Sequence, residues 1–63
     1  MQSNTTEQRY IELGDASWKK QDWKSCLDNY AEAIRLNPQS RAVAKREMVM
    51  SIISFYHKDM LNP

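Results

Sequence analysis

Apolar residues in the first third of the chain recur at the spacing of one face of a helix. The positions that share this face are Tyr10, Leu13-Gly14 and Ser17-Trp18, whereas charged residues fall on the opposite face. Because residues three to four apart lie side by side on a helix, the pattern predicts a helix from about Thr6 to Lys20. Thr5, followed three residues later by Gln8, fits a capping box at its start.

A second apolar stripe begins after a short polar break and predicts a second helix, from about Trp23 to Leu36. Its members are Trp23, Cys26-Leu27, Tyr30-Ala31 and Ala33-Ile34. Asp22 suits the N-cap because its carboxylate can accept hydrogen bonds from the backbone amides that follow. Asn37-Pro38 ends the helix because proline cannot continue the hydrogen-bond ladder. A connection this short forces the two helices into an antiparallel hairpin.

One glycine interrupts the first stripe. Gly14 inside a helix costs roughly 1 kcal/mol relative to alanine, so we expect another helix to approach closely at this point. Cys26 is predicted to face Gly14 across the hairpin. We also expect Cys26 to be a small core residue rather than a reactive thiol, because Lys24, the nearest cation in the sequence, lies on a different helix face.

Residues from Ser40 to about Lys58 predict a third helix, with Ser40 as its N-cap. Its second half is apolar on nearly all sides: one stripe is formed by Val49, Ile53, Tyr56 and Met60, and another by Met48, Ile52 and Phe55. A helix that is apolar all round is normally buried, but a single hairpin can cover only one stripe. We therefore expect self-association through this helix, or docking on another protein of a larger assembly. The residues predicted to self-associate are Met48, Val49, Ile52, Ile53, Phe55 and Tyr56.

The length of the chain strengthens this expectation. A 63-residue chain buries only about 60% of the surface that its unfolded form exposes, and such small domains usually need a disulfide, a metal or a partner. One cysteine excludes an internal disulfide, and one cysteine with one histidine is too little for a structural zinc site. Two of the three usual means of stabilisation are missing, which favours association with a second copy, as a homodimer, or with another partner.

Charge and hydropathy change the picture little. The net charge is +1 and both signs are mixed along the chain, so neither nucleic acid nor an anionic membrane is expected as a partner. The small basic cluster of Arg41, Lys45 and Arg46 is predicted to be a solvated helix face. No apolar run approaches the roughly 20 residues that span a bilayer, and the polar start does not read as a secretory signal. A cytoplasmic location is the expectation.

The sequence shows no residues arranged for catalysis. It has no nucleophile paired with a base, no glycine-rich phosphate loop and no metal-ligand spacing. His57 has no convergent partner and is predicted to be structural or solvent-facing. We therefore expect neither an enzyme nor a cofactor, and no small-molecule substrate.

The frame of the first two helices resembles one tetratricopeptide repeat. It consists of Tyr10, Leu13-Gly14, Trp23, Cys26, Tyr30, Ala33 and Pro38, with the ending Ala-Ile-Arg-Leu-Asn-Pro at 33–38. Cys26 replaces the usual alanine of this family, and Ser17 replaces the usual aromatic residue. The resemblance implies an all-α fold with right-handed superhelical packing. It divides the chain into a flexible start at 1–6, one repeat at 7–40, a closing or dimerisation helix at 41–60 and a tail at 61–63.

The same resemblance implies that the chain binds a protein or peptide. In the family, the first helix of each repeat lines a concave groove, and the positions here that would face it are Gln8, Ile11, Glu12, Asp15, Trp18 and Lys19. Asp15 stands where some members carry an asparagine that binds a terminal carboxylate, and its charge argues against that kind of ligand. The sequence leaves open whether Trp18 is an exposed anchor or is buried against the third helix or a second subunit.

Overall fold

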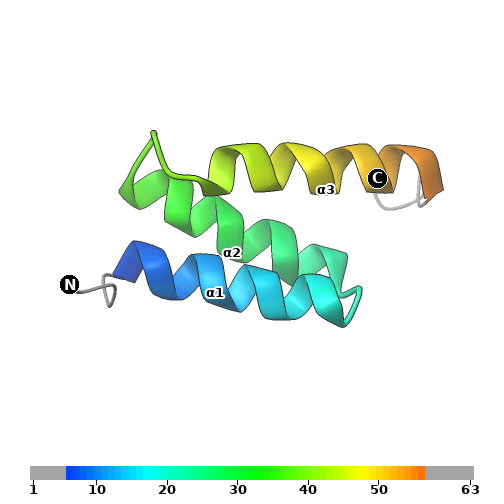
Figure 1. Ribbon diagram of the computed structural model, residues 1–63, viewed down its shortest axis with the longest axis horizontal. Coiled ribbons are helices and arrows are strands. Elements are labelled where there is room, and N and C mark those ends of the chain that lie inside the picture. Colours follow the sequence, from blue (N-terminus) through cyan, green and yellow to red (C-terminus); the bar gives the residue numbers. More distant parts are fainter. Residues whose placement is uncertain (1–5, 57–63) are drawn as a thin grey trace.

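The computed structural model describes residues 6–56, which form three helices: α1 (Thr6–Lys19), α2 (Trp23–Leu36) and α3 (Ala42–Tyr56). These helices take in 84% of the described residues, and no strand occurs among them, so the predicted all-α class is confirmed. Successive helices run antiparallel (Figure 1). The predicted helix bounds agree to within one residue for α1 and fully for α2. Several positions used in the sequence analysis, Thr5, His57, Lys58 and Met60, lie outside the described residues.

The connection between α1 and α2 is closed by backbone hydrogen bonds. The amide of Asp22 donates to the carbonyl of Ser17 at 2.9 Å, and the amide of Gln21 donates to the carbonyl of Trp18, also at 2.9 Å. This pairing is that of a Schellman motif, which satisfies carbonyls at a helix end and requires a left-handed residue. Gln21 supplies that residue with φ of 59°. Asp22 then caps α2 by accepting from the amide of Ser25 at 3.4 Å, as predicted.

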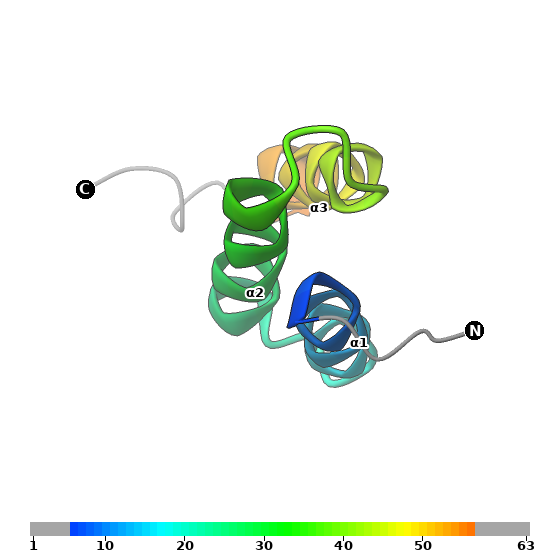
Figure 2. The same ribbon diagram turned by 90° about the vertical axis from the view of Figure 1, so that its left-hand side faces the viewer.

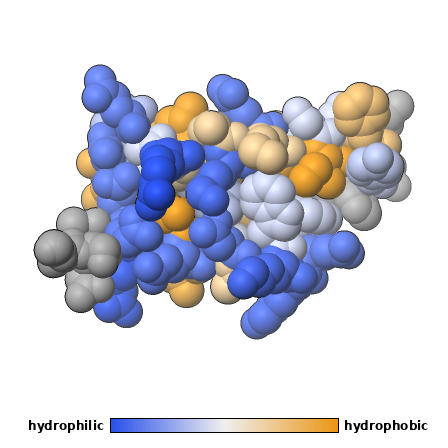
Figure 3. Space-filling view, viewed as in Figure 1, coloured by the Kyte–Doolittle hydropathy of each residue, from blue (hydrophilic) through white to orange (hydrophobic). Residues whose placement is uncertain are grey.

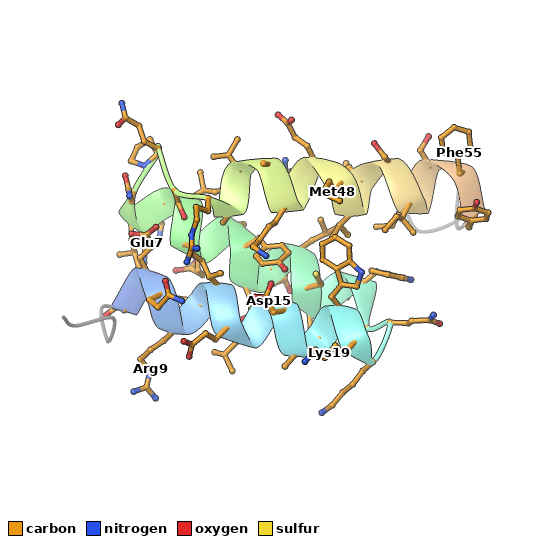
Figure 4. All side chains as sticks on the ribbon, in the orientation of Figure 1. Glu7, Arg9, Asp15, Lys19, Met48 and Phe55 are labelled. Atoms are coloured by element: carbon orange, nitrogen blue, oxygen red, sulfur yellow. The ribbon has the colours of Figure 1, made fainter. Side chains whose placement is uncertain are left out.

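The connection between α2 and α3 is tied to the start of α1. The Asn37 side chain donates to Glu7 at 3.2 Å and accepts from the amide of Gln39 at 3.1 Å. Ser40 is 5% exposed, and its hydroxyl accepts from the amide of Ala42 at 3.1 Å, which is the capping contact expected of this serine. Figure 4 shows Glu7 at the beginning of α1, close to this connection.

Helix α2 lies at the centre of the molecule, and α1 and α3 both pack on it (Figures 1 and 2). Seen nearly end-on, α1 and α3 flank the same side of α2, so that a face of the molecule runs between them (Figure 2). All three helices contribute to one core. Its buried members are Ile11 from α1, Trp23, Cys26, Tyr30 and Ala33 from α2, and Ala42, Val49 and Ile53 from α3.

Helices α1 and α2 approach closely at Gly14, where the nearest side chain is that of Tyr30 rather than the predicted Cys26. A Cβ atom at Gly14 would lie 2.5 Å from Cε1 and 2.6 Å from Cδ1 of the Tyr30 ring. Tyr30 is fully buried, and its hydroxyl donates to Asp15, the residue that follows Gly14 in α1. The Tyr30 ring thus occupies the space that a side chain at position 14 would need. The expectation of a close approach at Gly14 is confirmed.

The face of α1 that packs on α2 differs from the predicted stripe. Leu13 is 51% exposed, whereas Ile11 is 2% exposed and belongs to the core. Ile11, Gly14 and Trp18 follow one another at steps of three and four residues, so they form an equally regular helical face. Tyr10, Gly14 and Trp18 of the predicted stripe also pack inward, so the difference is confined to Ile11, which takes the place of Leu13.

Candidate protein-binding surfaces

The six residues predicted to face a groove do not share one environment. Ile11 is buried in the core and cannot contribute to an open groove. Glu12 and Lys19 are exposed, while Gln8, Asp15 and Trp18 are half-buried. The face concerned is the one that runs between α1 and α3 and points toward the viewer in Figures 1 and 4. We call it the α1–α3 face and define it by Gln8, Glu12, Asp15, Arg41 and Lys45.

Polar side chains bridge α1 and α3 across this face. The Arg41 guanidinium donates to Gln8 at 3.0 Å, and the Lys45 ammonium lies 3.2 Å from the carboxylate of Asp15. The same Asp15 carboxylate accepts from the hydroxyl of Tyr30, so one side chain of α1 is joined to both other helices. Two of the predicted groove residues, Gln8 and Asp15, are therefore already engaged inside the chain.

These bridges were not predicted from the sequence. Arg41 and Lys45 lie 33 and 30 residues away from their partners, and no local pattern links positions so far apart. Lys45 was expected on a solvated helix face, and its side chain is indeed 35% exposed. The contact with Asp15 is partly exposed to water and contributes little to stability, and the orientation of α3 follows instead from its buried residues Ala42, Val49 and Ile53.

Trp18 is neither the fully exposed anchor nor the fully buried residue that the sequence left open. It is half-buried and packs edge-on against two aromatic rings of α2, with centroid distances of 6.3 Å to Trp23 and 6.5 Å to Tyr30. Edge-to-face pairs at such distances are favourable beyond their buried area. Trp18 is thus a boundary residue: one part supports the hairpin, and the other part is open to solvent.

The six residues predicted for self-association fall into two groups. Val49 and Ile53 are fully buried against the hairpin, so they are not on the surface open to a second copy. Ile52 is half-buried beside them. Met48, Phe55 and Tyr56 are exposed by 57%, 79% and 77% respectively. We call Met48, Ile52, Phe55 and Tyr56 the α3 patch.

The exposure of Tyr56 has a geometric cause. Tyr56 follows Val49 and Ile53 at helical spacing and would be buried if the hairpin continued beneath it. Instead, the end of α3 projects beyond the α1–α2 connection (Figure 1). Phe55 also points away from the hairpin (Figure 4). In the space-filling view, apolar side chains follow α3 toward this end, whereas α1 is mainly hydrophilic (Figure 3).

The titratable core residues are arranged for packing. Cys26 is fully buried, and burial raises the pKa of its thiol, which disfavours the reactive thiolate. Burial and then the nearby Asp15 raise the pKa of Tyr30, so its hydroxyl stays a proton donor. The prediction that Cys26 is a core residue is confirmed.

The described residues show neither a metal-binding cluster nor a membrane-spanning helix. Within residues 6–56, no group of three or more His, Cys, Asp or Glu side chains is placed to hold a metal ion. No helix of this part of the chain is long and apolar enough to cross a membrane.

Comparison of the chain with protein-family models, with curated proteins and with solved structures gave no match. The tetratricopeptide resemblance therefore stays a prediction that rests on the residues of the hairpin frame.

Proposed function

We propose that this chain is a non-catalytic protein–protein interaction module of tetratricopeptide type, and that it self-associates through α3. The observation that carries the proposal is the unequal burial of α3. One stripe of this helix is fully buried at Val49 and Ile53, while Met48, Phe55 and Tyr56 remain more than half exposed. Large apolar side chains gathered on one surface element are typical of interaction sites.

The hairpin supports the tetratricopeptide part of the proposal. Gly14 admits a large aromatic ring from the second helix, and a third helix packs on the second, as a following repeat helix would. The peptide groove implied by the resemblance would lie on the α1–α3 face. There, a bound peptide would contact Glu12 and Lys19 directly but would compete with Arg41 for Gln8 and with Lys45 for Asp15. The α3 patch is therefore the stronger candidate for contact with a protein.

Sedimentation over a range of protein concentrations tests this proposal. We expect a reversible dimer whose population rises with concentration. Met48→Glu combined with Phe55→Glu should give a monomer with unchanged helix content, because both side chains lie outside the core. Ser54→Glu is the matched control: it adds a charge to an exposed position of the same helix and should leave the dimer intact. A wild-type chain that stays folded and monomeric at high concentration would refute self-association.

The alternative is an oligomerisation or adaptor segment of a larger protein assembly, with α3 docked on a different protein. Exposed Met48 favours this alternative, since methionine side chains adapt to partners of varied shape. It predicts that the isolated chain aggregates or binds a hydrophobic dye strongly. A clean monomer–dimer equilibrium with low dye binding would argue against it.

A further inference from the structure

One row of residues begins at Arg41, directly before α3, and continues along that helix with a change from cationic to apolar side chains. Arg41, Lys45, Met48, Ile52 and Phe55 follow one another in alternating steps of four and three residues, which keeps them on one side of the helix. This is the spacing at which two helices pack side by side along a common seam. The first two members are cationic, and the last three are apolar. No residue from Met48 to Tyr56 carries a charge.

The two halves of this row also differ in their surroundings. In the first half, Arg41 and Lys45 reach across to Gln8 and Asp15 of α1. In the second half, α3 projects beyond the hairpin, and Phe55 and Tyr56 are more than three-quarters exposed. A partner helix would thus meet α1 and its polar bridges at one end of α3, and an uncovered apolar surface at the other.

We propose that two copies of the chain pair through the second halves of their α3 helices, which run antiparallel across a two-fold axis near Ile52. This inference rests on the self-association proposed above and specifies its geometry. Among the described residues, an antiparallel pair overlaps only the uncharged halves and points the cationic halves away from each other. It also sets the two helix dipoles in opposition, which is the favourable arrangement.

A parallel pair is disfavoured by the same residues. It would bring Arg41 and Lys45 of one copy against the same residues of the other, so that like charges would face each other along the seam. It would also remove the bridge between Lys45 and Asp15 from water, and such desolvation of charges is costly.

The size of the patch sets the strength of the pairing. Phe and Tyr side chains bury about 150–250 Å² each when covered, so the α3 patch offers roughly 400 Å² per copy. A standard interface takes about 800 Å² per partner. Small residues beside the row, Ala44 and Ser51, allow the partner helix to approach closely and add contact area. We expect a dimer that dissociates on dilution.

Cross-linking at two matched positions tests the orientation. Ala44 and Ser51 are both small and exposed, and they lie seven residues apart on the same side of α3. In the antiparallel pair the two copies of Ser51 lie close to the axis, whereas the two copies of Ala44 are separated by roughly 24 Å along the helices. In a parallel pair, each position would face itself at about 10 Å.

The experiment compares Ala44→Cys and Ser51→Cys with a short bis-maleimide linker at a concentration where the wild type sediments as a dimer. The wild-type chain sets the background, because its single thiol, Cys26, is fully buried. Circular dichroism establishes that both variants fold. We expect covalent dimer from Ser51→Cys, at least tenfold above the yield from Ala44→Cys.

The other outcomes overturn the inference in distinguishable ways. Equal cross-linking at both positions would show parallel pairing, and cross-linking only at Ala44→Cys would show pairing through the cationic halves. Both results would leave the proposed self-association standing. Cross-linking at neither position in a chain that still sediments as a dimer would place the interface elsewhere. Monomeric sedimentation would refute the self-association itself.

Discussion

Tyr30 of the hairpin and Phe55 of α3 are both aromatic residues on helices of similar length, yet the first is fully buried and the second is 79% exposed. The difference lies in the elements that face them. Tyr30 points into the space between α1 and α2, where Gly14 leaves room for its ring. Phe55 lies where α3 extends beyond the hairpin, and no other described residue covers it. Within residues 6–56, the hairpin and the buried stripe of α3 form one core, while the far end of α3 presents apolar side chains to its surroundings.

The largest expected effect on stability comes from removing the buried aromatic side chain, that of Tyr30. Tyr30→Ala deletes the largest fully buried side chain and the hydrogen bond to Asp15. Large-to-small changes of this kind lower the free energy of unfolding by about 3–5 kcal/mol. Because the core of so small a domain supplies little more than that, we expect the variant to be largely unfolded at 25 °C by circular dichroism.

Phe55→Ala provides the matched control for this experiment. Measured on a dilute, monomeric sample, it should change the free energy of unfolding by no more than about 0.5 kcal/mol, since the side chain is mostly in water. Its effect should appear in the association constant instead. Equal loss of stability in the two variants would contradict the distinction between Tyr30 as a core residue and Phe55 as an exposed residue at the end of α3.

The second effect concerns the contact that makes the hairpin compact. Gly14→Ala places a Cβ atom against the Tyr30 ring, which is buried and held by Asp15 and therefore cannot easily withdraw. Overpacking costs about 1–3 kcal/mol, and the better helix propensity of alanine returns about 1 kcal/mol. We expect a net loss of up to about 2 kcal/mol in denaturant unfolding.

Ala16→Gly is the control, because it makes the reverse change at an exposed position of the same helix. It should cost about 1 kcal/mol through helix propensity alone. A gain in stability on Gly14→Ala would show that propensity decides at both positions and that the close approach to Tyr30 is not a constraint.

The sequence predicted what depends on neighbouring residues and missed what depends on distant ones. The three helices, the Asp22 cap and the end at Asn37 follow from local spacing and capping chemistry, and the structure has them. On the inward face of α1, Tyr10, Gly14 and Trp18 were predicted correctly, but Leu13 was expected inside in place of Ile11, because faces that include either residue have helical period. Which of these two residues is buried depends on how α2 packs across α1, and the spacing of residues along α1 does not show that.

The candidate surface shows the same limit. Two apolar stripes on α3 could be recognised from the sequence, but local spacing does not tell which of them meets the hairpin. The structure buries Val49 and Ile53 and leaves Met48 and Phe55 exposed. The projection of α3, which exposes Tyr56, depends on the relative lengths and crossing of the packed helices and has no signal in the order of residues.

A smaller effect concerns acid stability at the end of the hairpin near α3. Hydrogen bonds from Ser40 and Asn37 lower the pKa of Glu7. A carboxylate whose pKa is lower in the folded chain stabilises the fold fully above its unfolded pKa, about 4.3, and loses this contribution as pH falls through the folded value. We expect the midpoint of thermal unfolding to fall more steeply below that pH in the wild type than in Glu7→Gln.

Glu12→Gln serves as the comparison. Glu12 is exposed, and its carboxylate accepts a hydrogen bond from the Gln8 side chain at 3.4 Å. Its pH profile should follow that of the wild type. A Glu7→Gln profile that coincides with both would mean that the contacts with Ser40 and Asn37 do not persist in solution.

The smallest effect, and the only stabilising one, is expected at the connection between α1 and α2. Gln21 has a φ of 59°, a region that L-residues occupy at a cost of roughly 1–2 kcal/mol and glycine occupies freely. Gln21→Gly relieves that cost but gives the unfolded chain more freedom, so the net gain should be about 0.5 kcal/mol in denaturant unfolding. Gln21→Ala keeps the strained conformation and should show no gain. Because Gln21 is not part of the α3 patch, the glycine variant should raise the stability of the monomer without changing the dimer dissociation constant. A parallel change in that constant would show that the hairpin and the end of α3 are coupled rather than independent.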